Sequence, residues 1–212
     1  MKGWIKTTMR EIPVSVISET IEKLCIQACY NIGDDVKKLL IEAKEKEESP
    51  FGSQILSQIL DNIDASKEEQ LPLCQDTGMA VVFLEIGQDV HLSGGSLTAA
   101  VNEGVRRGYQ KGYLRKSVLS PLKRVNTGDN TPAIIHSEIV EGDQLKVTIA
   151  PKGFGSENMS QLVMLKPSDG IEGVKKFVLE TVTKAGANPC PPIILGIGIG
   201  GTMEKADRKS VV

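Results

Sequence analysis

The sequence predicts an α/β fold in which an N-terminal helical cluster packs on a mixed, largely buried sheet with flanking helices. Up to about residue 70, apolar side chains recur at three- and four-residue spacing, as they do on one face of a helix. Beyond residue 71, continuous apolar runs typical of buried strands alternate with further helical patterns. The 212 residues are expected to form a single domain, with 1–70 as the helical cluster and 71–212 as the sheet and its loops, because no linker separates the two parts.

Three helices are expected in the first seventy residues. The first runs from residue 13 to about 30, and Gly33 with Asp34 then ends it and caps the second, whose solvated end is the charged run 44–48. Ser49 and Pro50 fit the cap and the first turn of the third helix. The inward-facing residues are expected to be Ile17, Ile21, Leu24, Cys25 and Ala28; Val36, Leu39, Leu40 and Ala43; and Ile55, Leu56, Ile59, Leu60 and Ile63.

The middle of the chain predicts strands and one helix. The apolar run 79–84, which follows a loop at 71–78, is typical of a strand buried on both faces. A break at 93–95 precedes a helix expected at about 97–110. Two more strands are expected at 133–140 and 144–150, and the residues that join them, Glu141, Gly142 and Asp143, are typical of a hairpin turn.

The C-terminal part is expected to add a helix at about 172–185 and an apolar strand at 193–199. Gly200, Gly201 and Thr202 then open a final helix that the sequence leaves at Val212 after about two turns. We therefore expect either a fragment or a fold that is completed from elsewhere.

Composition argues against several classes of protein. Charge nearly balances, with 25 Lys and Arg residues against 27 Asp and Glu residues, which disfavours a strongly basic nucleic-acid binder. No apolar run reaches the roughly 18 residues that a membrane span needs. Glu11 follows the basic opening without an apolar signal core, so secretion is not expected. We expect a cytoplasmic protein with reduced cysteines and neither nucleic acid nor membrane as partner.

Two of the four cysteines occupy loop edges, where a thiolate can face a cavity. Cys74 and Cys190 each come immediately before an expected buried strand, and prolines flank Cys190. Neither belongs to a Cys-x-x-Cys pair, so no complete zinc site is encoded, and the alternative of two unrelated buried thiols stays open. Cys25 and Cys29 lie four residues apart on a helix, where core packing is favoured over metal ligation.

Glycine-bearing stretches at 152–158 and 196–202 are typical of turns whose backbone amides can approach an anion, and the stretch 126–132 is polar and turn-forming. The stretch 196–202 lacks the Gly-x-Gly-x-x-Gly spacing of a dinucleotide site. Arg115 follows an expected helix, where its guanidinium can pair with a carboxylate, whereas Arg106 and Arg107 lie within that helix. Structural roles are expected for His91 and His136.

A series of motifs, taken together and in order, resembles the alpha subunit of the two-subunit class I fumarate hydratases. The same family includes the alpha subunit of L(+)-tartrate dehydratase. The motifs are LCQDTGMAVVF, EGVRRGY, LRKSVL, NTGDNTPAIIH, PKGFGSENMS, NPCPP and GIGIGGTMEKA. The resemblance extends from about Ile12 to the last residue.

The resemblance implies an oxygen-sensitive 4Fe–4S cluster that is held by three cysteines, with one iron open to substrate. Cys74 and Cys190 match the first two ligands, and the third lies farther toward the C-terminus, in a region that this chain lacks. The family's general base and several carboxylate-binding residues lie in the beta subunit or the C-terminal domain. We therefore expect obligate association with a beta subunit, in a hetero- or homo-oligomer, and no hydratase activity of the chain alone.

The resemblance also implies roles for the residues after the first cluster ligand. Asp76 is the expected catalytic residue, placed to handle the proton on the departing hydroxyl. Gln75 can hydrogen-bond the substrate.

The two carboxylates of the substrate are expected to meet different parts of the chain. Arg115 can pair with one, and the backbone amides around Gly155 can hold the other. Arg107 and Gly153 are near alternatives for these two roles.

The leading hypothesis is a hydro-lyase subunit that interconverts fumarate and malate, the hydration step of the tricarboxylic acid cycle, together with a beta subunit. The nearest alternative is an L(+)-tartrate dehydratase alpha subunit, which applies the same chemistry to a substrate with one more hydroxyl. A hypothesis of another class is a truncated, non-catalytic module that binds a partner or iron. Ferredoxin-like electron transfer is disfavoured because only two plausible cluster cysteines are present.

Overall fold

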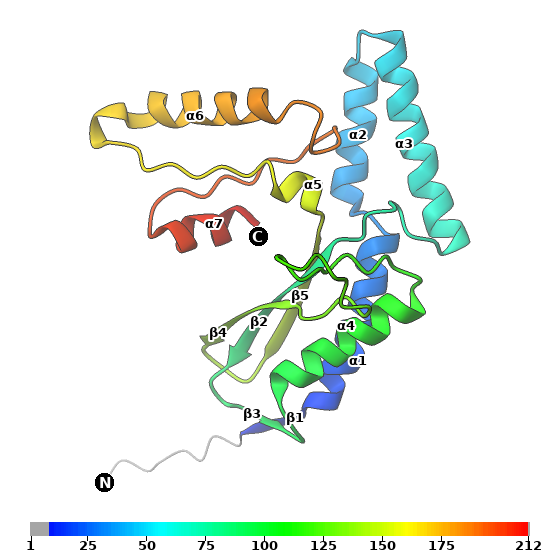
Figure 1. Ribbon diagram of the computed structural model, residues 1–212, viewed down its shortest axis with the longest axis vertical. Helices are drawn as coiled ribbons and strands as arrows, with labels where there is room; N and C mark the ends of the chain where they lie inside the picture. Colours follow the sequence, from blue (N-terminus) through cyan, green and yellow to red (C-terminus); the bar gives the residue numbers. More distant parts are fainter. Residues whose placement is uncertain (1–8, 212) are drawn as a thin grey trace. The chain divides into compact units, whose positions relative to one another are not determined.

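The computed structural model describes residues 9–211, with side chains up to Arg208 (Figure 1). The chain divides into two compact units, Met1–Lys152 and Gly153–Val212, and each is described by itself. The single domain expected from the sequence stays a prediction. The α/β class is confirmed, because helices pack around a mixed sheet.

The sheet of the first unit is built around strand β2 (Met79–Gly87). Strand β4 (Ile134–Val140) pairs with β2 in parallel on one side, and β5 (Leu145–Lys152) pairs with it antiparallel on the other. Along β2, buried residues such as Val82 and Leu84 alternate with half-buried ones such as Phe83. One face of β2 is therefore fully buried, where the sequence predicted two.

The predicted hairpin between the last two strands of this sheet is wrong. Both strands form, but β2 lies between them, so β4 and β5 do not pair with each other. Residues in and beside the expected turn instead bond the end of β2 and the residues after it: the Gly87 N–H donates to the Gln144 carbonyl at 2.7 Å and the Asp89 N–H to the Gly142 carbonyl at 3.0 Å. The physical reason is that β2 is the most apolar strand and gains most from the central position.

Helices α1 (Val14–Tyr30) and α4 (Leu97–Lys111) cover the buried face of the sheet (Figure 1). Glycines let the two helices approach closely, since a Cβ at Gly104 would come within 2.6 Å of the Ser18 carbonyl oxygen. The shared core contains Ile17, Ile21 and Cys25 of α1, Val101, Val105 and Tyr109 of α4, and Ala80, Val82 and Leu84 of β2.

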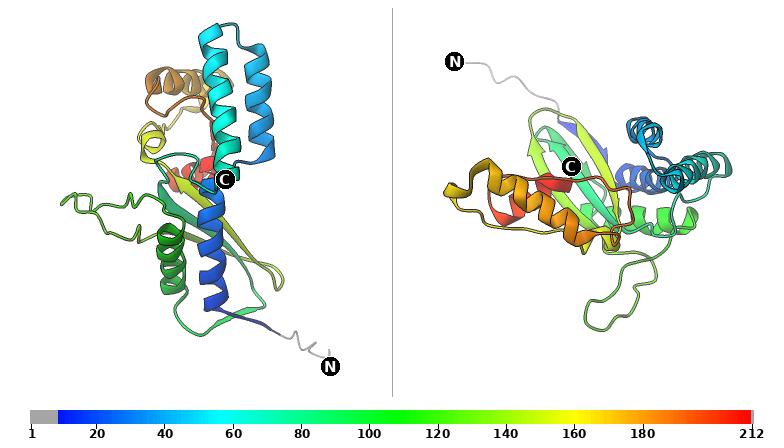
Figure 2. Two further views of the ribbon diagram at one scale, coloured as in Figure 1. Left: turned by 90° about the vertical axis from the view of Figure 1, so that its right-hand side faces the viewer. Right: turned by 90° about the horizontal axis from the view of Figure 1, so that it is seen from above.

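Helices α2 (Asp34–Lys46) and α3 (Pro50–Glu69) form an antiparallel hairpin with a small core of its own (Figure 2). Its buried residues are Leu40, Leu56 and Ile63. The predicted cap of α3 is confirmed, because the Ser49 hydroxyl accepts a hydrogen bond from the Gly52 N–H at 3.3 Å. Of the predicted helical cluster, α1 therefore belongs to the core of the sheet, and α2 with α3 has a separate core.

Two short strands were not predicted. Strand β1 (Arg10–Pro13) pairs in parallel with β3 (Val90–Ser93). Each has only four residues, which is too few for a periodic signal in the sequence.

The second unit contains α5 (Phe154–Glu157), the 3-10 helix η1 (Pro167–Asp169), α6 (Gly170–Ala185) and α7 (Met203–Val211). The helices predicted at about 172–185 and after residue 202 are confirmed. The predicted strand at 193–199 is wrong: the segment has no strand partner within the described part of the chain, and Ile194 is 77% exposed. An apolar run becomes a strand only where another strand pairs with it. No helix among residues 9–211 is both long and apolar enough to cross a bilayer.

Replacing Gly104 with alanine is expected to destabilise the first unit. Alanine favours a helix over glycine by about 1 kcal/mol, but the added methyl would collide with the backbone of α1, and such overpacking costs about 1–3 kcal/mol. Denaturant unfolding followed by circular dichroism measures the change. Gln110→Ala, at an exposed position of the same helix, is the control. A Gly104→Ala chain more stable than the original would contradict the close contact.

Candidate functional site

The loop that carries the first predicted cluster cysteine is fixed at the residue before it. This Cys74 loop (residues 74–78) connects Leu73 to β2. The Leu73 side chain packs on the core of the α2–α3 hairpin. Its N–H donates to the Cys29 carbonyl at 2.9 Å, and its carbonyl accepts from the Asn62 amide at 2.9 Å. The start of the loop is therefore tied to both α1 and α3.

Within the Cys74 loop, the reactive side chains face solvent. Cys74 and Gln75 are exposed, and Asp76 is half-buried. The Asp76 N–H donates to the Cys74 sulfur at 3.4 Å, and Asp76 Oδ1 accepts from the Gly78 N–H at 3.0 Å. The turn thus presents the sulfur with a backbone donor, and such hydrogen bonds commonly orient metal ligands.

The other end of the Cys74 loop is held by buried polar groups. The Tyr109 hydroxyl donates to the Thr77 carbonyl at 2.7 Å and lies 3.2 Å from the Gly78 carbonyl, which also accepts from the Asn130 amide at 3.1 Å. Burial raises the pKa of Tyr109 well above its usual range, so the hydroxyl remains a donor at all ordinary pH values. The buried carbonyls at the start of β2 are thereby satisfied.

The predicted substrate-binding arginine lies beside this loop. The Thr77 hydroxyl donates to the Arg115 carbonyl at 3.1 Å. The Arg115 side chain is exposed, and among the described residues it has no hydrogen-bond or ion-pair partner. The alternative, Arg107, pairs with Glu22 at 2.9 Å and donates to the Ser18 hydroxyl at 3.0 Å, so it is engaged between α1 and α4. Of these two arginines, Arg115 is the one whose guanidinium is available to a ligand.

The other cysteine pair is part of the core, as predicted. Cys25 is fully buried and Cys29 nearly so, and burial raises the pKa of each thiol to about 12. Such thiols are poor metal ligands and poor nucleophiles at neutral pH. His136 stacks on Phe83 with ring centroids 5.1 Å apart, in keeping with a structural role.

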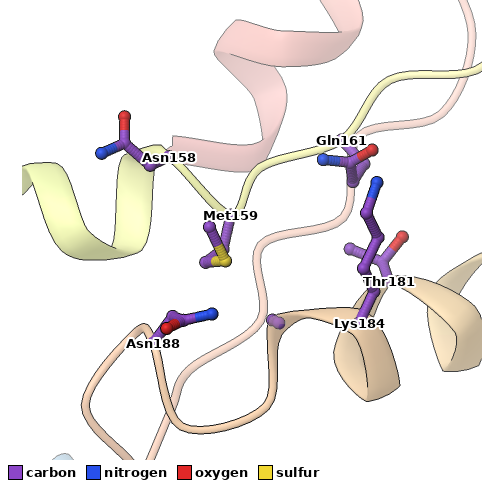
Figure 3. Close-up of a pocket in the computed structure, with 7 residues that line it drawn as sticks. Asn158, Met159, Gln161, Thr181, Lys184 and Asn188 are labelled. Carbon is purple, nitrogen blue, oxygen red and sulfur yellow. The ribbon is translucent and has the colours of Figure 1, made fainter.

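The second unit brings together two of the predicted stretches. Gly155 lies in α5, and a Cβ at its position would be 3.4 Å from the Asn188 carbonyl oxygen, two residues before Cys190. Cys190 is exposed and has a left-handed backbone with φ of 58°. Beside these stretches lies a cavity of about 310 Å³ (Figure 3), lined by Asn158, Met159, Gln161, Thr181, Lys184, Ala185 and Asn188.

The predicted site residues thus form two groups. The first unit holds Cys74, Gln75, Asp76 and Arg115, and the second holds Gly155 and Cys190. Within residues 9–211, no group of three or more His, Cys, Asp or Glu side chains is assembled for a metal ion.

Sequence reasoning missed the residues that hold the Cys74 loop. Asn130 lies in a turn-like stretch, and its polar neighbours gave no sign that it is fully buried. Tyr109 has an i−4 apolar neighbour in Val105, so the helical spacing could have placed it in the core. Its hydroxyl partner could not be read from that spacing.

Comparisons with known proteins identify the family of the chain. A family model described as fumarate hydratase (fumerase) matches residues 18–211. The putative L(+)-tartrate dehydratase subunit alpha of Methanocaldococcus jannaschii is 45% identical over 197 residues, which cover 90% of this chain and 69% of the relative. The L(+)-tartrate dehydratase subunit alpha of Escherichia coli is 30% identical over 206 residues, which cover 94% of this chain and 68% of the relative. The chain belongs to the fumarate hydratase family, a family of hydro-lyases.

The four cysteines are expected to react in two classes. In metal-free protein at pH 8, iodoacetamide should label Cys74 and Cys190, which are exposed, and spare Cys25 and Cys29, whose pKa of about 12 leaves almost no thiolate. Peptide mass spectrometry measures the labelling, and urea-unfolded protein, in which all four should react, is the control. Equal labelling of the four in folded protein would contradict the burial.

Proposed function

We propose that this chain is the alpha subunit of an iron–sulfur hydro-lyase, which adds water to fumarate and removes it from malate together with a beta subunit. Membership of the fumarate hydratase family supports the reaction class. The observation that carries the proposal is the placement of an exposed thiol, a carboxylate and a guanidinium without a partner among the described residues on anchored backbone at Cys74, Asp76 and Arg115. A charged dicarboxylate needs both a cationic partner and a proton carrier near the scissile C–O bond.

The donor set fits an iron–sulfur cluster. Cys74 and Cys190 are exposed free thiols, and the Cys74 sulfur accepts a hydrogen bond from the backbone, as cluster sulfurs commonly do. In this proposal Cys74 and Cys190 are two of the ligands, and the core thiols of Cys25 and Cys29 are not ligands. When bound, such a cluster supplies a Lewis-acid iron for the hydroxyl of the substrate.

The residues of the chain itself bind, orient and move a proton. Oδ1 of Asp76 is engaged by the Gly78 N–H, whereas Oδ2 has no partner among the described residues and is the atom that carries the proton. Arg115 pairs with one carboxylate of the substrate, and the exposed Gln75 hydrogen-bonds it. The backbone amides around Gly155 hold the second carboxylate.

A second candidate substrate is L(+)-tartrate. The relatives from Methanocaldococcus jannaschii and Escherichia coli carry the name L(+)-tartrate dehydratase subunit alpha. Tartrate and malate present the same two carboxylates and a leaving hydroxyl, so the same residues would serve both.

Turnover by the complex of the full alpha subunit with its beta subunit tests the substrate and the role of Asp76. After anaerobic reconstitution, we expect hydration of fumarate, with malate turned over faster than L(+)-tartrate. Asp76→Asn is expected to lower kcat by about 10²–10⁴-fold, the usual contribution of a positioned acid or base. Asp61→Asn, an exposed carboxylate on α3, is the matched control. A strong preference for L(+)-tartrate would contradict fumarate and malate as the substrates and favour L(+)-tartrate instead.

Iron content tests the proposed ligands separately from turnover. In the reconstituted complex, Cys74→Ser and Cys190→Ser should each lower bound iron and the visible absorption of the cluster. Cys29→Ala, which alters a core thiol, should retain both. Full iron content in either serine variant would reject that ligand. A cluster that forms but never supports hydration would favour the non-catalytic module.

A further inference from the structure

We infer that Asn130 is a positioning residue, which sets the placement of Asp76 relative to Arg115; the inference rests on the proposed function. Asn130 is fully buried and lies in the long loop between α4 and β4, the Arg115 loop (residues 112–133). Figure 2 shows this loop extending away from the helices. A buried asparagine amide needs partners for both its oxygen and its nitrogen.

The two ends of the Asn130 amide bond two different loops. Oδ1 accepts from the Ser117 N–H at 2.7 Å and from the Val118 N–H at 3.2 Å, two and three residues after Arg115. Nδ2 donates to the Gly78 carbonyl at 3.1 Å, two residues after Asp76. One side chain therefore connects the backbone beside the proton carrier to the backbone beside the cation.

The backbone on either side of Asn130 is itself fixed to α4. Asp129 accepts from the Arg106 guanidinium at 2.9 Å and from the Thr131 N–H at 3.0 Å. Although partial burial opposes it, the hydrogen bonds from Thr131 and Arg106 hold the pKa of Asp129 below its usual value. The Ala133 N–H donates to the Asn102 side chain of the same helix at 2.9 Å. Asn130 is thus a fixed point against which both loops are placed.

The backbone conformation at residue 130 explains why asparagine suits this position. Asn130 has φ of 63°, in the left-handed region that asparagine and glycine tolerate. Glycine keeps this conformation but has no amide, so Asn130→Gly removes the connection without forcing a new backbone geometry. Asn130→Asp keeps the acceptor for Ser117 and Val118 and replaces the donor to Gly78.

The test uses the reconstituted complex of alpha and beta subunits. We expect both variants to bind iron as the unsubstituted complex does and to lose about 10²-fold in kcat/KM, mostly in kcat, because Asp76 and Arg115 remain but are misplaced. Exchange of the Ser117 and Val118 amide hydrogens should quicken in Asn130→Gly and stay slow in Asn130→Asp. Loss of kcat in Asn130→Asp with slow exchange would identify the Gly78 bond as the one that matters.

The matched control is Asn126→Ala in the same loop. Asn126 donates to the Lys116 carbonyl at 2.8 Å and accepts from the Gly128 N–H at 2.7 Å, so it ties the Arg115 loop to itself only. Because Asn126→Ala leaves the bond from Asn130 to Gly78 in place, its kcat should fall much less than that of Asn130→Gly. An unchanged kcat per bound cluster in Asn130→Gly, with fast exchange at Ser117 and Val118, would overturn the inference. Absence of turnover in the unsubstituted complex would overturn the proposed function instead, and this inference with it.

Discussion

Two buried carbonyl groups determine how this site is built. The carbonyls of Thr77 and Gly78 lie where the Cys74 loop enters the core strand β2, and both residues are buried. A buried carbonyl without a donor costs about 1–3 kcal/mol, so the fold must bring donors to them. Tyr109 comes from α4 and Asn130 from the Arg115 loop. Satisfying the core strand therefore also assembles the segments that carry the candidate functional residues.

In the Cys74 loop, the anchored residues and the residues proposed to react are different ones. The residues on either side of the reactive positions, Leu73 and Thr77, are held by the helical hairpin, by Tyr109 and by the carbonyl of Arg115. Cys74 and Gln75, between them, are exposed. A short segment with both ends anchored loses little further conformational entropy when a ligand binds, which is the usual benefit of preorganisation.

The parts of the fold that local sequence determines were predictable, and the non-local parts were not. The spacing of Ile17, Ile21 and Cys25 specifies α1 by itself, and Ser49 specifies the start of α3. The residues around Gly142 resembled a hairpin turn because no local feature of the sequence shows that β2 pairs with both neighbouring strands. Among the candidate site residues, motifs predicted Cys74, Asp76 and Arg115. Asn130 was missed because its burial depends on three segments that meet only in the folded chain.

The residues proposed for chemistry contribute little to the stability of the fold, so stability does not explain why these residue types occur there. Tyr109 and Asn130 are buried and bonded, so each contributes to the stability of the fold whatever it contributes to activity. Cys74 is exposed, and the guanidinium of Arg115 bonds no described residue. Alanine at either position would leave the core packing intact. Since the fold does not require a thiol or a guanidinium there, both groups are available for binding, and this is the premise of the proposal that Cys74 ligates a metal and Arg115 pairs with a carboxylate.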